Sequence, residues 1–109
     1  MKTGDIVLVP FPFTELNNIK VRPAVVISTT KDKYEGLIVS AISSVIPDSI
    51  SPNEFIIEIS SVNNLRSKSV IKVDRIVTIK KESVIAEIGN LSEIELNNFI
   101  SVFKNLIKQ

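Results

Sequence analysis

The chain has 109 residues, a formal net charge of +1, and neither cysteine nor histidine. This length suffices for a hydrophobic core, so we expect a single domain over residues 1–109. Without cysteine the chain has no disulfide and no thiolate metal site. Without histidine, a Ser-His-Asp triad, a paired-histidine ribonuclease mechanism and a histidine-rich zinc site are all excluded.

Hydrophobic residues make up 44% of the chain, with isoleucine and valine prominent, and charged residues make up 23%. This composition indicates a folded domain rich in strands. No apolar run approaches the roughly 20 residues that span a bilayer. The N-terminus does not match a signal-peptide pattern, because a turn and an acidic residue interrupt it. We therefore expect a cytoplasmic protein without membrane contact. Because the net charge is nearly neutral, any nucleic-acid surface must be a local patch.

Runs of β-branched residues, separated by turn formers, predict many short strands. The run at 37–42 is apolar on both faces and is expected to be central in a sheet. A polar connection over 60–67 has room for one helical turn. The predicted strands cover residues 6–9, 22–29, 37–42, 54–59, 69–73 and 76–79, with 84–88 as a candidate seventh.

The C-terminal segment changes to the period of a helix. Ser92 and Glu95 match a capping box, and an apolar stripe follows at helical spacing. We expect an amphipathic helix of about four turns. Many short strands and one terminal helix favour a small, strongly bent sheet or a partly open barrel. The stripe consists of Leu96, Phe99, Ile100, Phe103, Leu106 and Ile107.

An arginine–proline step, Arg22-Pro23, opens the second predicted strand. Proline cannot donate to a strand ladder, so Arg22 is expected where the strand begins, beside a loop. A guanidinium fork at that position can hold a phosphate. On the residues alone, a solvated arginine or a surface salt bridge is the more ordinary explanation.

Three segments together resemble the MazF/PemK toxins of type II toxin–antitoxin pairs. They are residues 4–7 (Gly-Asp-Ile-Val), residues 21–26 (Val-Arg-Pro-Ala-Val-Val), and residues 69–79 followed by a Gly-Asn-Leu-Ser helix start. Each motif is short, but their order and spacing cover nearly the whole chain. The resemblance implies a mainly β protein with a C-terminal α-helix, an SH3-like small barrel of the MazF/CcdB-like type, acting as a homodimer.

The resemblance also implies an activity, namely sequence-selective, metal-independent cleavage of single-stranded RNA without a cofactor. The products would carry a 2′,3′-cyclic phosphate and a 5′-hydroxyl, and a cognate antitoxin would cover the RNA groove with an acidic tail. By position, Arg22 matches the family's catalytic arginine. Ser43 falls on the second catalytic position, commonly threonine, and keeps its hydroxyl. If the alignment with the family is shifted by one residue, Ser44 takes this position instead of Ser43. Asp74 matches an acidic or polar position in the family's RNA groove.

For this chemistry the nucleophile is the substrate's own 2′-hydroxyl. Arg22 suits stabilisation of the crowded phosphorane, and Ser43 suits donation to a phosphate oxygen, although a turn serine is its ordinary role. The residue that accepts the proton stays open. Two other functions also stay open. One is a non-catalytic toxin or binding module of the same fold that inhibits a protein target such as a topoisomerase. The other is a regulatory barrel without activity.

The loop over residues 11–20 joins the first two strands and is expected beside Arg22. Its polar side chains suit the reading of RNA bases, although a solvated hairpin loop explains them equally well. The basic residues Arg66, Lys68, Lys72 and Arg75 suit either an RNA path or, by preference, a solvated strand face. The candidate RNA-binding residues of the loop are Thr14, Glu15, Asn17 and Lys20.

Overall fold

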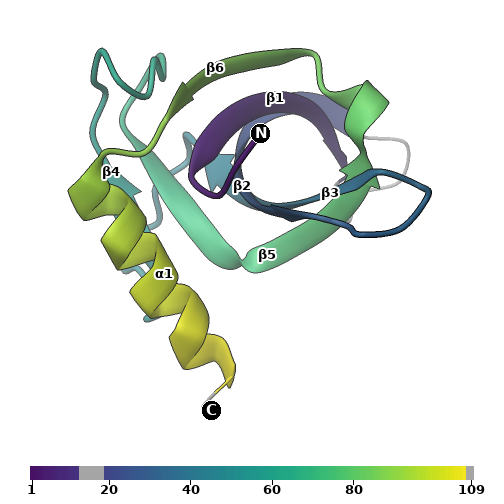
Figure 1. The fold of residues 1–109 in the computed structure, drawn as a ribbon. Coiled ribbons are helices and arrows are strands. Elements are labelled where there is room, and N and C mark those ends of the chain that lie inside the picture. Colours follow the sequence, from purple (N-terminus) through teal and green to yellow (C-terminus); the bar gives the residue numbers. More distant parts are fainter. Residues whose placement is uncertain (13–18, 108–109) are drawn as a thin grey trace.

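The structure of the protein is a computed structural model, and it describes residues 1–12 and 19–107. Within these residues it contains six strands, one short 3₁₀ helix and one α-helix (Figure 1). In chain order the elements are β1 (Asp5–Pro12), β2 (Ile19–Thr29), β3 (Gly36–Ser43), β4 (Glu54–Ile57), β5 (Ser69–Lys80), the 3₁₀ helix Lys81–Ser83, β6 (Ala86–Asn90) and α1 (Glu93–Ile107).

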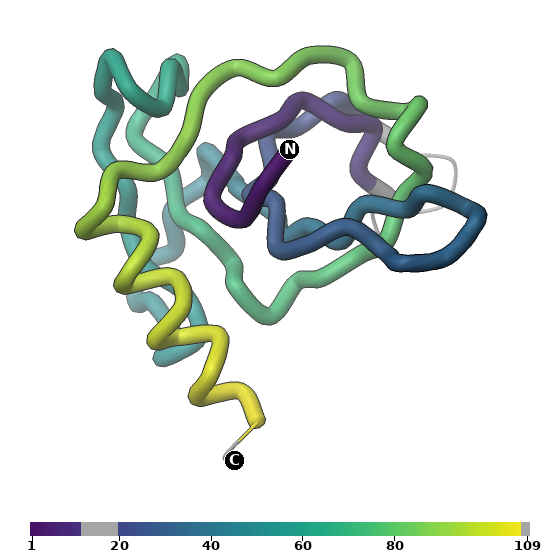
Figure 2. The backbone as a smooth tube through the Cα atoms, viewed as in Figure 1, coloured from purple at the N-terminus to yellow at the C-terminus, as the bar shows by residue number. Residues whose placement is uncertain are grey.

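The strands form one antiparallel sheet in the order β4-β5-β3-β2-β1-β6. The expected central position of the third strand is confirmed. The register shifts in the pairings β1–β6, β2–β3 and β3–β5, and such bulges bend and twist strands. The sheet consequently curls into a half-barrel with α1 against its outer side, as the tube in Figure 2 shows. The predicted fold class is thereby confirmed.

Two hydrophobic cores result because successive side chains of a strand point to opposite faces. The inner core lies inside the curl, and the helix-side core lies between the sheet and α1. The inner core consists of Val7, Val9, Phe11, Ala24, Val26, Leu37, Val39 and Ala41. The helix-side core consists of Ile6, Val25, Ile42, Ile57, Leu65, Ile71, Val73, Leu91 and Phe99.

The predicted helix start is confirmed in atomic detail. The Ser92 hydroxyl accepts from the backbone N–H of Glu95 at 3.2 Å, and the Glu95 carboxylate accepts from the backbone N–H of Ser92 at 2.8 Å. This reciprocal pair satisfies two N–H groups that a helix otherwise leaves unpaired. Phe99 is 1% exposed and anchors the helix in the helix-side core.

The fifth and sixth predicted strands form one continuous strand, β5, so the predicted break was wrong. In the β3–β5 ladder Ser40 faces Ile76 while Ala41 faces Lys72, which leaves three β5 residues, 73–75, without a β3 partner. The charged pair Asp74-Arg75 lies in this bulge and separated the two predicted strands. The buried Ser40 hydroxyl donates to the carbonyl of Val73 at 2.9 Å and so satisfies a group that the bulge removed from the ladder.

Strands β1 and β2 are longer than predicted. The prediction was too short because it placed the strand limits at Pro10, Pro12 and Pro23. Pro10 and Pro12 pair only with β2, since the β1–β6 ladder ends at Leu8. A missing N–H costs nothing on an unpaired side of a strand. In contrast, β4 ends at Ile57, two residues earlier than predicted.

The candidate seventh strand exists as β6, shifted toward the C-terminus. The Gly89-Asn90 pair, expected to close it, instead pairs with Ile6 and Asp5. A Cβ atom on Gly89 would lie 2.4 Å from the carbonyl oxygen of Val62, so only glycine permits this close approach.

In the connection before β5, the Asn64 N–H donates to the Ser60 carbonyl at 3.0 Å, which makes the expected helical turn a single α-turn.

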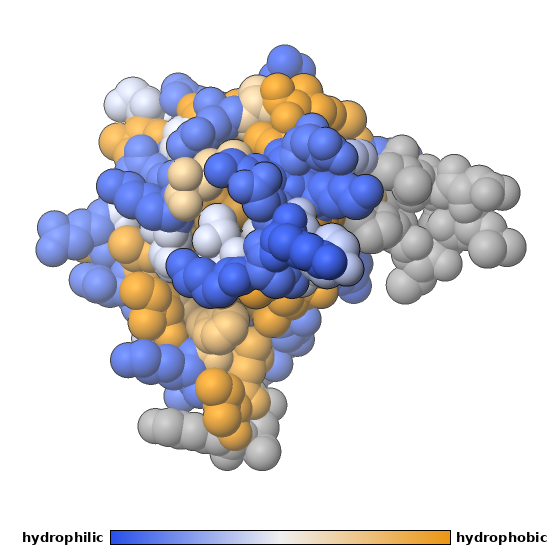
Figure 3. Space-filling view, turned by 45° about the vertical axis from the view of Figure 1, so that its right-hand side comes forward, coloured by the Kyte–Doolittle hydropathy of each residue, from blue (hydrophilic) through white to orange (hydrophobic). Residues whose placement is uncertain are grey.

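The surface mixes hydrophilic and apolar side chains. On the face in Figure 3, hydrophilic residues dominate the centre, and apolar patches lie around them. The largest exposed fractions among bulky apolar residues belong to Ile94, at 81%, and Ile107, at 80%, both on α1. In the described part of the chain, α1 included, no helix combines the length and the apolar character that crossing a membrane requires.

Candidate functional site

Arg22 lies near the start of β2, where β2 has only one neighbour. It pairs with Val9 of β1, whereas the β2–β3 ladder begins two residues later, at Ala24 opposite Ala41. Pro23 separates Arg22 from that ladder. Because proline offers no N–H to β3, the start of β2 is released from the sheet while the next residue stays paired. Continuing the β2–β3 register by two residues places Arg22 opposite Ser43.

Ser43 is the last residue of β3, and its hydroxyl takes part in the turn that follows. Its Oγ accepts from the Val45 N–H at 3.1 Å, so the ordinary turn role is present. The nearest acceptor for the hydroxyl among the described residues is the Val45 carbonyl, at an oxygen–oxygen distance of 3.5 Å, which is long for an O–H donor. The turn therefore fixes the oxygen and leaves its O–H bond only weakly engaged.

Arg22 and Ser43 line the same hollow, which we call the smaller hollow and which has a volume of about 160 Å³. Lys72 and Arg75 of β5 also line it. The Lys72 ammonium pairs with the Glu54 carboxylate at 3.7 Å. The smaller hollow thus gathers three cations. Its lining residues are Phe11, Arg22, Ala41, Ile42, Ser43, Val45, Lys72 and Arg75.

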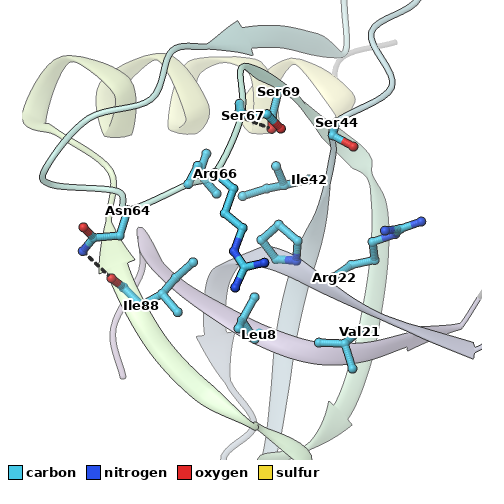
Figure 4. Close-up of a pocket in the computed structure, with 12 residues that line it drawn as sticks. Leu8, Val21, Arg22, Ile42, Ser44, Asn64, Arg66, Ser67, Ser69 and Ile88 are labelled. Carbon is cyan, nitrogen blue, oxygen red and sulfur yellow. Dashed lines mark hydrogen bonds between the residues drawn. The ribbon is translucent and has the colours of Figure 1, made fainter.

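A second hollow of about 710 Å³, the larger hollow, adjoins the first and shares Arg22 and Ile42 with it. Figure 4 shows the Arg66 guanidinium pointing into it, whereas the Arg22 guanidinium turns away toward its side. The larger hollow is lined by Leu8, Val21, Arg22, Pro23, Ile42, Ser44, Asn64, Leu65, Arg66, Ser67, Ser69 and Ile88.

The segment that carries Arg66 is held by hydrogen bonds on both sides. The buried Asn63 side chain accepts from the N–H groups of Ser60 and Leu65, at 3.1 and 3.0 Å, and donates to the Glu58 carbonyl at 2.8 Å. Asn64 adopts a positive φ of 54°, a conformation in which asparagine is enriched.

The other predicted RNA-binding residues lie in different places. Ser44 lines the larger hollow. Asp74 is exposed in the β5 bulge and accepts from the Asn53 amide at 3.3 Å. Lys20 is exposed and lines neither hollow. Thr14, Glu15 and Asn17 lie outside the described residues.

The structure places most of the basic residues near β5 at the two hollows. Arg66 lines the larger hollow, and Lys72 and Arg75 line the smaller one, so three of the four do not simply cover a strand face. Lys68 pairs with Glu58 at 3.6 Å and lines neither hollow. The sequence does show the concentration of positive charge around the start of β5. It does not show the bulge in β5 that places Arg75 at the smaller hollow.

A curled antiparallel sheet with one C-terminal helix, bearing a cationic hollow beside an arginine–proline step, defines a small-barrel protein that is equipped to bind an anion. Residues 2–107 match the family model of PemK-like, MazF-like toxins of type II toxin–antitoxin systems. Because the match covers almost the whole chain, the protein belongs to this toxin family, and the resemblance seen in its sequence is confirmed.

Solved structures with the same fold include two mycobacterial proteins. One is an endoribonuclease in complex with its cognate antitoxin, with 11% sequence identity, a TM-score of 0.74, and coverage of 99% of this chain and 95% of that chain. The other is the Mycobacterium tuberculosis toxin MazF-mt6, with 18% identity, a TM-score of 0.72, and coverage of 95% and 96%. At these identities the likeness shows the fold. No curated protein sequence matches the chain significantly.

Proposed function

We propose that the protein is a toxin that cleaves single-stranded RNA as a sequence-selective endoribonuclease, without a metal or cofactor. Membership of the toxin family supports this proposal. The observation that carries it is the smaller hollow, in which Arg22 and Ser43 meet Lys72 and Arg75. Three cations in the lining of a small hollow suit a phosphodiester, because phosphate oxygens accept charge-assisted hydrogen bonds from arginine and lysine.

In the proposed reaction the 2′-oxygen of the substrate attacks the adjacent phosphorus. A new P–O2′ bond forms, the P–O5′ bond breaks, and the products carry a 2′,3′-cyclic phosphate and a 5′-hydroxyl. One proton leaves the 2′-hydroxyl and one joins the departing 5′-oxygen. Arg22 neutralises the charge that gathers on the non-bridging oxygens in the transition state. Ser43 donates its weakly engaged O–H to one of these oxygens.

The other cations of the hollow contribute binding and orientation. Arg75 projects from the β5 bulge and forms no ion pair within residues 1–12 and 19–107, so its guanidinium can meet a neighbouring phosphate. Lys72 already shares its charge with Glu54. Positioning the substrate in line is a large share of catalysis when the substrate supplies its own nucleophile.

The proposed partners are a cognate antitoxin and a second copy of the chain. One structural neighbour is described as an endoribonuclease in complex with its cognate antitoxin. A cationic hollow suits an acidic antitoxin segment for the same reason that it suits RNA, namely charge complementarity. The antitoxin would therefore inhibit by occupying the RNA site, and the homodimer follows from the family resemblance.

The proposal is tested by incubating the pure protein with single-stranded RNA in excess chelator and mapping the ends of the fragments. We expect cuts with 2′,3′-cyclic phosphate and 5′-hydroxyl ends, and cutting at least about a hundredfold slower with Arg22→Ala. Uncut RNA, or fragments with a 3′-hydroxyl, would contradict the proposal. A protein that inhibits growth without cutting RNA, and that loses toxicity when the end of α1 is truncated, would instead be a binding module.

A further inference from the structure

We propose that the larger hollow is a nucleobase subsite, and that Arg66 selects a guanine there. The inference rests on the proposed RNA substrate and deepens it by assigning the sequence preference to a residue and a base. Three observations carry it: the apolar lining of the larger hollow, the donor fork that projects into it, and its junction with the smaller hollow at Arg22.

The lining suits the flat face of a base better than a phosphate. Leu8, Pro23, Ile42 and Ile88 supply apolar surface, and Arg22 and Arg66 are the charged side chains that line the hollow. A phosphate would gain nothing from the apolar part, whereas an unstacked base is buried by it. The volume of about 710 Å³ falls within the roughly 300–1,000 Å³ typical of small-ligand sites.

Arg66 supplies the polar contact of this subsite. Its guanidinium points into the hollow (Figure 4) and forms no ion pair or hydrogen bond with the described residues. Arginine offers only donors, in a planar fork. Guanine presents two adjacent acceptors, O6 and N7, that match such a fork, whereas adenine places a donor beside N7. Pyrimidines lack N7 altogether. The fork therefore favours guanine over the other three bases.

The backbone on either side of Arg66 is fixed before any ligand arrives, while the Arg66 side chain itself is exposed. Leu65, directly before it, is buried in the helix-side core, and the Ser69 hydroxyl donates to the Ser67 carbonyl at 2.9 Å directly after it. The side-chain amide of Asn64 also donates to the Ile88 carbonyl at 2.6 Å (Figure 4), which ties this loop to β6. A fixed backbone lowers the entropy lost on binding, because only the Arg66 side chain has still to be ordered.

The position of the larger hollow fits the path of an RNA strand. Arg22 lines both hollows, so a phosphate held in the smaller hollow places a neighbouring base at the mouth of the larger one. Sequence-specific recognition of RNA commonly takes unstacked bases of this kind, read on their edges by side chains. One residue thus joins the site of the reaction to the site of selection.

The test measures binding of short oligoribonucleotides whose sugars are 2′-fluoro, which removes the attacking hydroxyl and prevents cleavage. Each oligonucleotide carries one guanine, at a different position, or 7-deazaguanine, which lacks the N7 acceptor. For wild-type protein we expect one position where guanine binds about tenfold or more tightly than adenine, and where 7-deazaguanine loses most of that gain. Arg66→Ala should bind guanine and 7-deazaguanine equally.

Two further variants separate base reading from general charge. Arg66→Lys keeps the charge without the planar fork, so it should retain affinity for RNA but not the guanine preference. Lys68→Ala removes a cation two residues away that lines neither hollow, and it should behave as wild type. Thermal unfolding of each variant checks that the fold is kept.

The outcomes that overturn the inference are equally specific. An equal loss of affinity for every oligonucleotide in Arg66→Ala would make Arg66 a phosphate contact. A guanine preference that survives in Arg66→Ala, that Arg66→Lys restores, or that wild type never shows would also overturn it. Cleavage of unmodified RNA is measured separately. Protein that binds guanine but does not cut would refute the proposed function alone, and protein that cuts without this preference would refute the subsite alone.

Discussion

The two hollows that meet at Arg22 differ in the kinds of residues that line them. The smaller one concentrates three cations, from β2 and β5, around the Ser43 hydroxyl. The larger one is four times as voluminous or more, carries apolar residues over much of its lining, and adds only Arg66 to the shared charge. Charge density suits a phosphate, and apolar area suits a base. The contrast indicates how a nearly neutral chain can concentrate positive charge locally for the proposed RNA substrate.

The hollows also differ in how their key side chains are supported. Ser43 ends a strand and is fixed by one turn hydrogen bond, at 3.1 Å from the Val45 nitrogen. Arg66 lies on a loop that the buried Asn63 secures with three hydrogen bonds. Damage to the smaller hollow should therefore reduce the rate of cleavage, and damage to the larger hollow should first reduce discrimination between sequences. The following predictions test that division.

Removing Arg22 should have the largest effect, because this residue belongs to both hollows. For Arg22→Ala we expect cleavage to fall about 10²–10³-fold, the cost of removing one donor to a developing oxyanion. The thermal midpoint should change little. Arg22→Lys keeps the charge but not the fork and should recover only part of the rate. Initial rates on a defined RNA measure both; an undiminished rate would break the assignment.

Removing the Asn63 side chain, which holds the loop beside the larger hollow, should reduce both stability and base selectivity. Asn63→Ala leaves the Ser60 and Leu65 N–H groups and the Glu58 carbonyl without their partner, and Asn63 is 0% exposed. An unsatisfied buried group costs about 1–3 kcal/mol, so a clear drop in the unfolding midpoint is expected. Asn97→Ala, on the exposed face of α1, is the matched control. An unchanged midpoint would show that the loop does not depend on Asn63.

Ser43 should matter for rate more than for stability. Hydrogen bonds to charged groups contribute about 1.5–3 kcal/mol, so Ser43→Ala should slow cleavage by about tenfold to a hundredfold. Ser43→Thr retains the hydroxyl with a stiffer side chain and should keep or raise the rate. Single-turnover cleavage separates this effect from binding. Equal rates for the alanine and threonine variants would leave Ser43 as a turn residue only.

Arg75 should contribute the smallest and least selective effect. Its position in the smaller hollow predicts a phosphate contact, so Arg75→Ala should weaken binding of every RNA sequence to a similar degree. The slope of log affinity against log salt should become shallower by about 0.7, the value for one phosphate contact on a single strand. A salt titration with uncleavable RNA measures it. A change in base preference would instead place Arg75 among the base-reading residues.

Much of the fold could be predicted because its local signals agree with its tertiary packing. The alternation in β1, β2 and β3 sorted their side chains between two cores, and the capping box at Ser92 located the start of α1. The errors came where tertiary context overrides a local signal. Pro10 and Pro12 looked like strand ends, yet they lie on a strand side that has no partner. The residues after Val73 were left out of the predicted strands, yet they form a bulge within β5.

The candidate site was less accessible from sequence than the fold. Arg22 stood out because proline marks a strand start, and Ser43 followed from the family resemblance; both roles remain predictions. That the two line one hollow depends on the β2–β3 register, which no local pattern specifies. Arg66, Lys72 and Arg75 could be noticed as a basic cluster, but their division between two hollows arises from the curl of the sheet.

The β5 bulge has one more consequence, for how the chain tolerates changes in length. Ile71 and Val73 face the helix-side core, whereas Val77 and Ile79, also odd-numbered, face the inner core. The three residues without a β3 partner produce this exchange of faces. Inserting or deleting two residues there would keep every later side chain on its present side. Inserting one residue would move every later side chain of β5 to the opposite face of the sheet. The lengths of natural variants should therefore differ at this bulge by even numbers of residues.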